Sequence, residues 1–535
     1  MTAWLQARST RTLAAIAFTG SLCFGLASPP SAVPALAWLG FIPLLLAAVG
    51  VRGRSGKSQF FVGWVGGLCT GLVGFPWIAL TLERFAGFPS WLAFLGLFLF
   101  AAFTAVPYGL WVLCVARGPR AGVLRFVWAA ASWVGLTTLW PAFFPYTPLI
   151  GLAQRAPWIQ AAELGGVPAV EWIVLGFGYA VVAALLATQT RVRLVAGAVA
   201  LALPALSWGL GSWRLAVLDA QAEHAPVVTF GIVQPNTALF ANRRLDKMQR
   251  LWAMSAAAQA EGADVIVWPE AGIYPWVQTR PWTEDGQGMR RVLKAHERPT
   301  ILGVATHAMG DPYEWNTAVV MNAQGEITAS FDKTVLVPFG ERIPIVDPRW
   351  AQRYVPAMSH NHAGEDPALF PVELADGSAT YGAGPLICYE DIFADFAREV
   401  AAQERGIEFF VNVTIDTWFG DTAEPWEHLA LAQFRSVEHR VPMVRSVAAG
   451  ASSVVDHGGR LVASLPVSDP QPTRPVGPQR LVHAVALPRN TADAPTIYAR
   501  GGWLLGLLCA VATVLVPLGA WGRRRLAAPK EPQPS

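Results

Sequence analysis

Residues 502–521 read GWLLGLLCAVATVLVPLGAW, a run without a charged side chain that is followed by Arg523, Arg524 and Arg525. A helix needs about 20 apolar residues to cross a bilayer. The run therefore predicts a membrane-spanning helix. It decides the fold because the long polar region that precedes it must then lie between membrane helices.

Seven further apolar stretches of similar length lie upstream. They are residues 12–28, 34–51, 59–82, 90–115, 122–140, 167–187 and 194–212. Only 14% of the chain is charged, against about 25% in a typical soluble domain. Residues 1–212 hold twelve basic and three acidic side chains, and all nine histidines come later. The first stretch alone would suit a signal peptide, but seven more favour an uncleaved helix.

The charge distribution predicts four regions. They are a seven-helix transmembrane domain (1–212), a folded polar domain (213–498), an eighth transmembrane helix (499–522) and a tail (523–535). The formal net charge of +3 excludes a nucleic-acid binder that works through bulk charge.

Basic residues in the short loops predict the orientation, since they collect on the cytoplasmic side. With a cytoplasmic N-terminus, ten fall on that side: Arg8, Arg11, Arg52, Arg54, Lys57, Arg117, Arg120, Arg125, Arg191 and Arg193. Only Arg84 and Arg155 fall on the other. We therefore expect a bacterial inner-membrane protein with both termini in the cytoplasm and residues 213–498 in the periplasm.

The polar region has an α/β pattern, in which short β-rich runs alternate with helical stretches. The predicted strands are 227–234, 264–270, 300–307, 317–322, 327–337, 384–390, 408–415, 442–449 and 480–487. The predicted helices are 245–261, 391–405 and 424–440. No Gly-rich phosphate loop, CxxC pair or repeat of fixed period accompanies them.

Three places in this region carry reactive side chains. Glu270 ends the apolar run VWPE, Lys333 and Glu341 lie in FDKTVLVPFGERIP, and Cys388 follows the strand GPLI. Cys388 is the only cysteine of the polar region, and a helix N-terminus after it would favour its thiolate. Glu270 could take the thiol proton, while Lys333 and the Tyr389 N–H could stabilise an oxyanion. Taken singly, each residue has a plainer explanation as a surface charge or a buried apolar group.

The order WPE, DKxxLVPFGE and CYE resembles the carbon–nitrogen hydrolase (nitrilase) superfamily, which uses a Glu-Lys-Cys triad on an αββα sandwich. With the membrane stretches around it, the chain closely resembles the apolipoprotein N-acyltransferase family. Further matching motifs are GIVQPN (231–236), NTA (316–318), DxWFGD (416–421), PWxH (425–428) and RS (445–446).

The resemblance assigns roles residue by residue. It implies that Glu270 is the general base, Lys333 the oxyanion stabiliser, Cys388 the acyl-accepting nucleophile and Glu341 a supporting carboxylate. Residues implied to shape the site and its entrance are Asn316, Tyr389, Glu390, Trp418 and Phe419. It implies no cofactor and no metal.

The implied reaction takes an acyl chain from a membrane phospholipid onto Cys388 as a thioester. The chain then passes to the α-amine of an S-diacylglyceryl cysteine on an apolipoprotein, and we expect a monomer. Three features depart from the family pattern: Ile415, the stretch Val447-Ala448-Ala449, and TALFANRR after QPN. They leave open an amidase or an acyltransferase with another acceptor, and a non-catalytic paralogue also stays open.

Two polar clusters need a separate interpretation. Ser359-His360-Asn361-His362, near Glu365 and Asp366, has too few ligands at set spacing for a metal site and is interpreted as a polar loop. The basic run Arg243, Arg244, Lys247 and Arg250 is interpreted as a solvated helix face, with anionic-lipid contact as the alternative.

Overall fold

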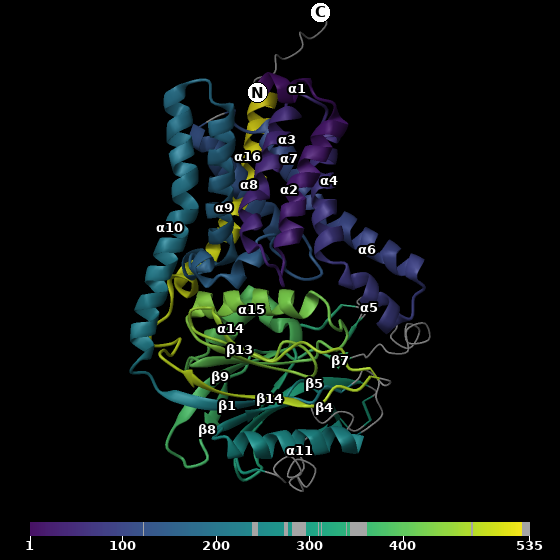
Figure 1. Ribbon diagram of the computed structural model, residues 1–535, viewed down its shortest axis with the longest axis vertical. Coiled ribbons are helices and arrows are strands. Elements are labelled where there is room, and N and C mark those ends of the chain that lie inside the picture. Colours follow the sequence, from purple (N-terminus) through teal and green to yellow (C-terminus); the bar gives the residue numbers. More distant parts are fainter. Residues whose placement is uncertain are drawn as a thin grey trace, which may run out of the picture.

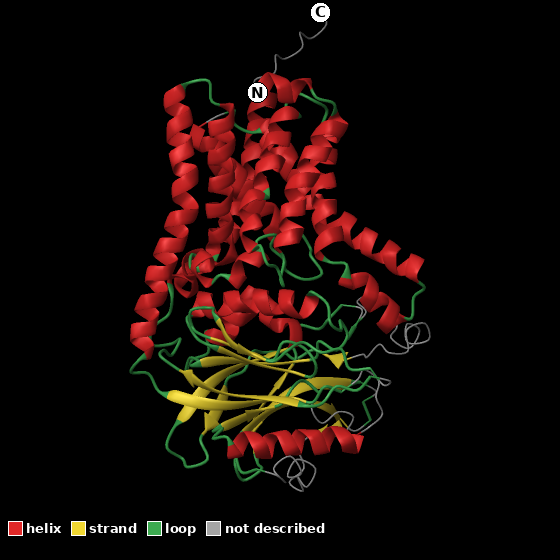
Figure 2. Ribbon diagram, in the orientation of Figure 1, coloured by secondary structure: helices red, strands yellow, loops and turns green. Residues whose placement is uncertain are grey.

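The chain forms a bundle of long helices joined end to end to a sandwich of two β-sheets, in a computed structural model (Figures 1 and 2). The residues described are 1–120, 122–237, 244–271, 277–280, 296–308, 310–311, 313–338, 340–342, 361–471 and 474–526. The N-terminus lies at the end of the bundle remote from the sheets (Figure 1).

The bundle is built from the helices before residue 223 and from the last one. The α-helices are α1 (Thr2–Ala7), α2 (Thr10–Ala27), α3 (Phe41–Gly50), α4 (Gly56–Gly74), α5 (Trp77–Ala86), α6 (Ser90–Thr104), α7 (Val106–Arg117), α8 (Gly122–Leu139), α9 (Ala162–Leu186), α10 (Thr190–Ala222) and α16 (Leu504–Leu526). Short 3₁₀ helices are η1 (Pro34–Leu39), η2 (Ile150–Gln154) and η3 (Ala156–Ile159), and the π-helical η6 (Tyr498–Gly502) leads into α16.

All eight predicted apolar stretches lie on helices. Among the described residues, six helices are long and apolar enough to cross a membrane, or seven if a bent pair counts as one span. That pair is α4 and α5, whose axes are bent by 58° relative to each other around Pro76. The stretch 59–82 is therefore not one straight helix. Within residues 34–51, η1 and α3 together make a shorter apolar helix over Pro34–Gly50. The count of eight spans therefore stays a prediction.

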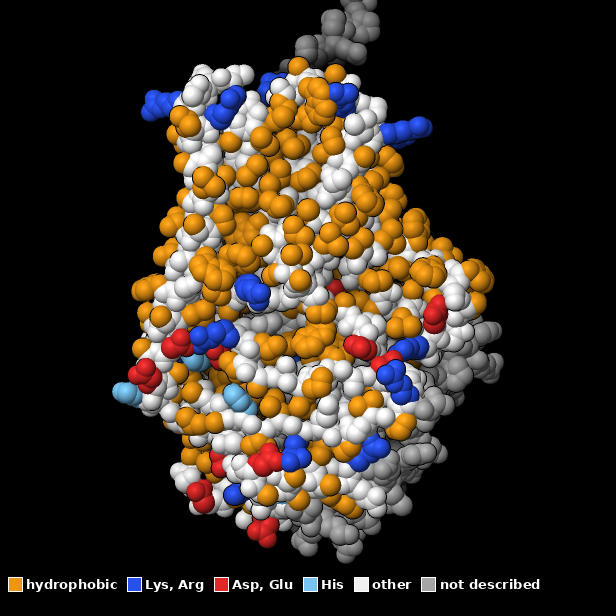
Figure 3. All heavy atoms as spheres, in the orientation of Figure 1, with side chains coloured by type: hydrophobic (Ala, Val, Ile, Leu, Met, Phe, Trp, Pro, Cys, Tyr) orange, Lys and Arg blue, Asp and Glu red, His pale blue; other side chains and the backbone are white. Residues whose placement is uncertain are grey.

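Large apolar side chains cover the outside of the bundle, whereas charged side chains gather at its remote end and on the sheet domain (Figure 3). On α6, Trp91 is 70% exposed and Phe94 61% exposed; on α10, Leu201 is 78% exposed. A surface of this kind suits lipid rather than water. The protein is therefore embedded in the membrane by several helices.

The polar region folds into two sheets. The first holds β1 (Val227–Gln234), β2 (Val265–Val267), β3 (Val277–Arg280), β4 (Thr300–Ala308), β5 (Glu314–Met321), β6 (Ile327–Asp332), β7 (Asn361–His362) and β14 (Gln479–Ala486). The second holds β8 (Phe370–Glu373), β9 (Thr380–Ile387), β10 (Phe409–Thr414), β11 (Met443–Val447), β12 (Ser453–Val455) and β13 (Leu461–Ser464).

The two sheets pack face to face, with helices on both outer faces (Figure 1). The main path of the first sheet runs β14-β1-β2-β4-β5-β6, and the second runs β13-β12-β11-β10-β9-β8. β1, β2 and β4 are parallel to one another, as are β9, β10 and β11. Helix α11 (Arg244–Ala260) covers the first sheet, and α14 (Ala394–Ala401) and α15 (Glu424–His439) cover the second. The expected αββα sandwich is confirmed.

Helix α15 lies between the sandwich and the membrane bundle. Its Leu429 and Ala432 belong to the hydrophobic core of the sandwich domain, whereas Phe434 and Val437 belong to the core of the bundle. This double packing explains why almost every residue of α15 is buried, polar ones included.

Helix α10 runs from the bundle down the side of the sandwich (Figure 1). It has 33 residues, and its last turns are bonded to neighbouring elements. Arg214 pairs with Glu163 at 2.6 Å, the Leu218 carbonyl lies 3.3 Å from His457 Nε2, and Asp219 pairs with Arg460. These contacts fix the sandwich to the bundle on this side.

Most predicted strands and helices match elements of the structure to within a few residues. β1 coincides with the predicted 227–234, and β3, β7, β8, β12 and β13 were not predicted. These five strands have two to four residues each, too short for an alternating pattern to be visible. The helix predicted at 391–405 is split into the 3₁₀ helix η5 (Cys388–Ile392) and α14.

Candidate active site

Glu270, Lys333 and Cys388 each follow the carboxyl end of a strand. Lys333 comes directly after β6 and Cys388 directly after β9, while Glu270 lies three residues beyond β2. Cys388 has φ = 53°, in the left-handed region that few residues with a Cβ adopt. Such strained backbone is common at active sites, because the fold around it must hold the side chain in place.

The structure brings the predicted charged residues into one cluster. Lys333 Nζ lies 2.9 Å from Glu341 Oε2 and 3.6 Å from Glu270 Oε1. Asn316, on β5, donates from Nδ2 to Glu270 Oε1 at 2.5 Å and to Glu341 Oε1 at 3.1 Å. One ammonium and one amide thus hold the two carboxylates side by side.

The cluster is shielded from water, which excludes the plainer interpretation as surface charges. Lys333 is 1% exposed and Glu270 is 6% exposed. Burial raises the pKa of Glu270, although Lys333 acts against this shift. Burial alone would lower the pKa of Lys333, but Glu341 and Glu270 raise it well above its usual value. Lys333 is therefore a fixed positive charge beside the general-base candidate.

Cys388 differs from the expectation of a thiolate favoured by a helix N-terminus. Burial, with Glu270 second, raises the pKa of its thiol to about 12. The element after β9 is the five-residue η5 rather than an α-helix, so little helix dipole faces the sulfur. The thiol is protonated at rest, and a base must take its proton during the reaction.

Glu390 and Tyr389 tie the cysteine turn to the lysine segment. Glu390 is fully buried and accepts three backbone N–H groups: Thr334 at 2.7 Å, Val335 at 3.0 Å and Ile387 at 2.8 Å. The Tyr389 hydroxyl donates to the Leu336 carbonyl at 3.1 Å. Glu390 therefore belongs to the framework of the site, and none of its contacts within the described part of the chain places it at an entrance.

Trp418 and Phe419 lie against α5, which together with α6 forms an arm at the side of the bundle (Figure 1). Trp418 meets Phe85 edge to face with ring centroids 4.7 Å apart, and Phe419 meets Trp77 in the same way at 5.2 Å. Arg84 of α5 also pairs with Asp469 of the sandwich at 2.8 Å. The loop that carries the two aromatic residues is thus in direct contact with the membrane part.

A buried network behind the cysteine turn was not assigned a role from the sequence. His428 of α15 lies 2.8 Å from Asp391 Oδ1 and 3.3 Å from Asp416 Oδ1, and Arg445 also pairs with Asp391. Burial alone would lower the pKa of His428, but Asp416 and its neighbours raise it to about 9. The motifs PWxH, DxWFGD and RS contain three of these residues and were the signal available.

The same network offers the best candidate for metal ligands in the described residues. Asp416, Glu424 and His428 each present one ligand atom, all within 4.8 Å of one another. A charged imidazole between carboxylates accounts for the same spacing, so the geometry calls for no ion. His362, considered above for a metal, instead pairs with Asp311 at 2.9 Å and stacks on Trp315. Outside the described part of the chain lie Arg243, Ser359, His360 and the side chain of Arg244.

The basic run on α11 is not a solvated face where the structure describes it. Lys247 donates to the Ala271 carbonyl at 2.5 Å. Arg250 donates to the carbonyls of Pro235 at 3.2 Å and Val476 at 3.1 Å. Both side chains are turned toward neighbouring loops, so the prediction of a solvated face was wrong.

The stretch Val447-Ala448-Ala449, which departs from the family pattern, is buried near the network, whereas most of TALFANRR lies outside the described residues. Val447, Ala448 and Ala449 are at most 4% exposed. The Ala448 carbonyl accepts the Asn236 N–H at 2.9 Å, which joins the two sheets. A Cβ on Gly450 would lie 2.8 Å from Asp416 Oδ2, so this stretch packs directly against the network.

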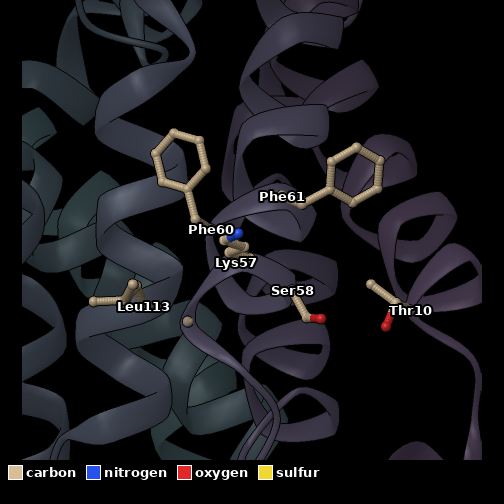
Figure 4. Close-up of a pocket in the computed structure, with 7 residues that line it drawn as sticks. Thr10, Lys57, Ser58, Phe60, Phe61 and Leu113 are labelled. Carbon is tan, nitrogen blue, oxygen red and sulfur yellow. The ribbon is translucent and has the colours of Figure 1, made fainter.

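A shallow, open pocket of about 720 Å³ lies beside α2, α4 and α7, in the bundle rather than at the reactive cluster, and its walls are mostly apolar (Figure 4). Its lining residues are Thr10, Gly56, Lys57, Ser58, Phe60, Phe61 and Leu113. None belongs to the reactive cluster.

Comparisons with known proteins agree with both parts of the structure. The carbon-nitrogen hydrolase profile matches residues 229–469, and that of the apolipoprotein N-acyltransferase N-terminal domain matches residues 20–180. An apolipoprotein N-acyltransferase of Allorhizobium ampelinum is 30% identical over 84% of this chain and 87% of its own. The chain belongs to the apolipoprotein N-acyltransferase family.

Other relatives extend this assignment along the chain. An apolipoprotein N-acyltransferase of Gloeobacter violaceus is 28% identical over 97% of this chain and 98% of its own. Among solved structures, Saccharomyces cerevisiae Nit3 of the nitrilase superfamily matches 51% of this chain and 93% of its own, with 15% identity and a TM-score of 0.37. Family membership makes the chain a bacterial membrane acyltransferase that acts in lipoprotein N-acylation.

Proposed function

We propose that this enzyme moves an acyl chain from a membrane phospholipid to the α-amine of an S-diacylglyceryl cysteine on an apolipoprotein. The acyl chain would pass through a thioester on Cys388. The observation that carries the proposal is the buried group of Glu270, Lys333 and Glu341 beside the strained Cys388 turn.

In the first half-reaction, Glu270 takes the proton of the Cys388 thiol. The sulfur then attacks the ester carbonyl, and Lys333 and the Tyr389 N–H stabilise the oxyanion. Collapse breaks the ester C–O bond, and the lysophospholipid leaves with the proton that Glu270 held. Burial raises the pKa of Glu270, and a higher pKa makes its carboxylate a stronger base toward the thiol proton.

In the second half-reaction, Glu270 takes a proton from the incoming amine, whose nitrogen attacks the thioester carbonyl. The C–S bond breaks, and the Cys388 sulfur regains a proton from Glu270. The products are an amide and the free thiol, so the cycle closes without a cofactor. Glu341 and Asn316 support it by holding Lys333 and Glu270 in register.

The architecture supports substrates that remain in the bilayer. Each CH₂ group drawn from lipid into water costs about 0.8 kcal/mol, so long acyl chains resist extraction. The arm of α5 and α6 has exposed apolar residues and contacts the loop of Trp418 and Phe419. The excess of basic residues at the remote end of the bundle supports a periplasmic location for residues 213–498, with both termini in the cytoplasm.

The test is mass spectrometry of a diacylglyceryl-cysteine peptide incubated with phospholipid and the purified full-length enzyme. Cys388→Ala is the variant, and Cys23→Ala is the matched control because Cys23 lies in α2 of the bundle. We expect the peptide to gain one acyl chain with wild type and control but not with Cys388→Ala. Lys333→Ala should lose thioester formation while it keeps the fold.

Other outcomes separate the alternatives. Acylated Cys388 with an unchanged peptide would point to another acceptor or, if fatty acid is released, to a hydrolase. Folded protein that acylates neither group would refute the proposal and favour a non-catalytic paralogue.

A further inference from the structure

The turn after Glu270 adopts an unusual backbone conformation. Ala271 has φ = 48°, in the left-handed region that is strained for a residue with a Cβ. The turn also presses on β4: a Cβ on Gly303 would lie 2.6 Å from Glu270 Cα and 2.7 Å from Ala271 N. Gly303 thus supports the turn from one side, and a second contact is needed to hold it there.

Lys247 supplies that contact from α11. Its Nζ donates to the Ala271 carbonyl at 2.5 Å, a short bond from a charged donor. Loss of hydration lowers the pKa of Lys247 to about 8. A lysine on a helix surface normally keeps its hydration. Lys247 instead exchanges hydration for one carbonyl, and this bond fixes the direction of that carbonyl.

Helix α11 is a rigid base for this bond. Met248 and Leu251 lie in the core between α11 and the first sheet, in the same cluster as Trp268. The Trp268 indole donates to Ser255 Oγ at 2.9 Å, so α11 is also bonded to the chain two residues before Glu270. The segment from Trp268 to Ala271 is therefore attached to α11 at both ends.

We propose that Lys247 is a positioning residue that holds the Glu270 carboxylate toward Cys388 through the Ala271 carbonyl. The inference rests on the proposed function only in the role given to Glu270. Without Lys247, the left-handed turn would relax and the Glu270 carboxylate would move from its contacts with Lys333 and the Cys388 thiol. A displacement of about 1 Å at such a group can cost on the order of 100-fold in rate.

The experiment compares Lys247→Met with Arg250→Met in the full-length protein. Arg250 is the matched control, since it lies one turn further along α11 and donates to carbonyls away from Glu270. The measurement is the rate at which iodoacetamide alkylates Cys388, followed by mass spectrometry of its peptide across pH. This readout needs neither phospholipid nor acceptor, so it is independent of the acyl-transfer proposal.

We expect Lys247→Met to slow alkylation at neutral pH by about 10- to 100-fold, because a displaced Glu270 no longer takes the thiol proton. At high pH, where hydroxide ionises the thiol without Glu270, the rates of the variant and the wild type should converge. Arg250→Met should retain the wild-type pH–rate curve, and Lys247→Arg, which keeps a charged donor, should recover part of the rate. If Lys247→Met does not fold, Lys247→Gln keeps a neutral donor and should show a smaller loss of rate at neutral pH. An unchanged curve in folded Lys247→Met, or an equal loss in Arg250→Met, would overturn the inference.

Discussion

Replacement of Glu390 tests whether the cysteine turn and the lysine segment are held together by one carboxylate. Glu390→Ala removes the acceptor of the Thr334, Val335 and Ile387 N–H groups. Each buried donor left unsatisfied costs about 1–3 kcal/mol, so the loss should lie between about 3 and 9 kcal/mol. Glu390→Gln keeps one oxygen, which can serve Thr334 and Val335, and should cost only about 1–3 kcal/mol for the third donor.

The assay is thermal unfolding of the purified protein in detergent, together with the rate of Cys388 acylation. Glu399→Gln is the control, because Glu399 lies on α14 with its side chain 52% exposed. We expect the apparent melting temperature to be highest for Glu399→Gln, lower for Glu390→Gln and lowest for Glu390→Ala. The rate of Cys388 acylation should fall in the same order. Equal melting temperatures for all three would refute the view that Glu390 joins the two segments.

Three further predictions follow from buried or interfacial charges. The pKa of His428 is about 9, against ~6.5 in an unfolded chain, so its charge stabilises the fold fully below roughly pH 6.5. This contribution is lost as the pH rises through about 9. His428→Gln should flatten that part of the melting-temperature profile, and an unchanged slope would contradict the pairing with Asp416. Trp77→Phe removes the indole N–H that donates to Glu427 Oε2 at 3.0 Å, and it should lower the free energy of unfolding by about 1–3 kcal/mol. A double-mutant cycle with Glu427→Leu should show coupling between the two positions, and the absence of coupling would contradict the bond. Arg84→Gln breaks a partly exposed ion pair and should change the melting temperature by the equivalent of less than about 1 kcal/mol, so a larger drop would mean that this contact is desolvated in the membrane.

The fold was largely predictable because its signals are local. Membrane helices show in runs of about 20 apolar residues, and the longer strands show in β-branched runs. The reactive residues were visible for a similar reason, since Lys333 and Cys388 directly follow apolar strands. The break between α4 and α5 was not predicted, because the apolar run 59–82 continues across it and only Pro76 marks the bend.

The supporting residues could not be found in the same way, because their partners are distant in the chain. His428 meets Asp391 only when α15 packs on the second sheet. Lys247 was misinterpreted because its acceptor is a main-chain carbonyl, which no side-chain pattern reveals. For Lys333, the sequence predicted the role, but its burial against two carboxylates is seen only in the structure.

The length of α10 has a mechanical consequence for the attachment of the sandwich. At about 1.5 Å per residue its 33 residues span roughly 50 Å, some 20 Å more than the hydrocarbon of a bilayer. Because its last turns are bonded to Glu163, His457 and Arg460, the surplus forms a rigid connection between the bundle and the sandwich. One residue inserted before these turns would rotate their side chains by about 100° around the helix axis and break the three contacts. Seven inserted residues would restore the direction of the side chains but shift them by about 10 Å along the axis, so the length of α10 has to match the packing of α15 on the bundle.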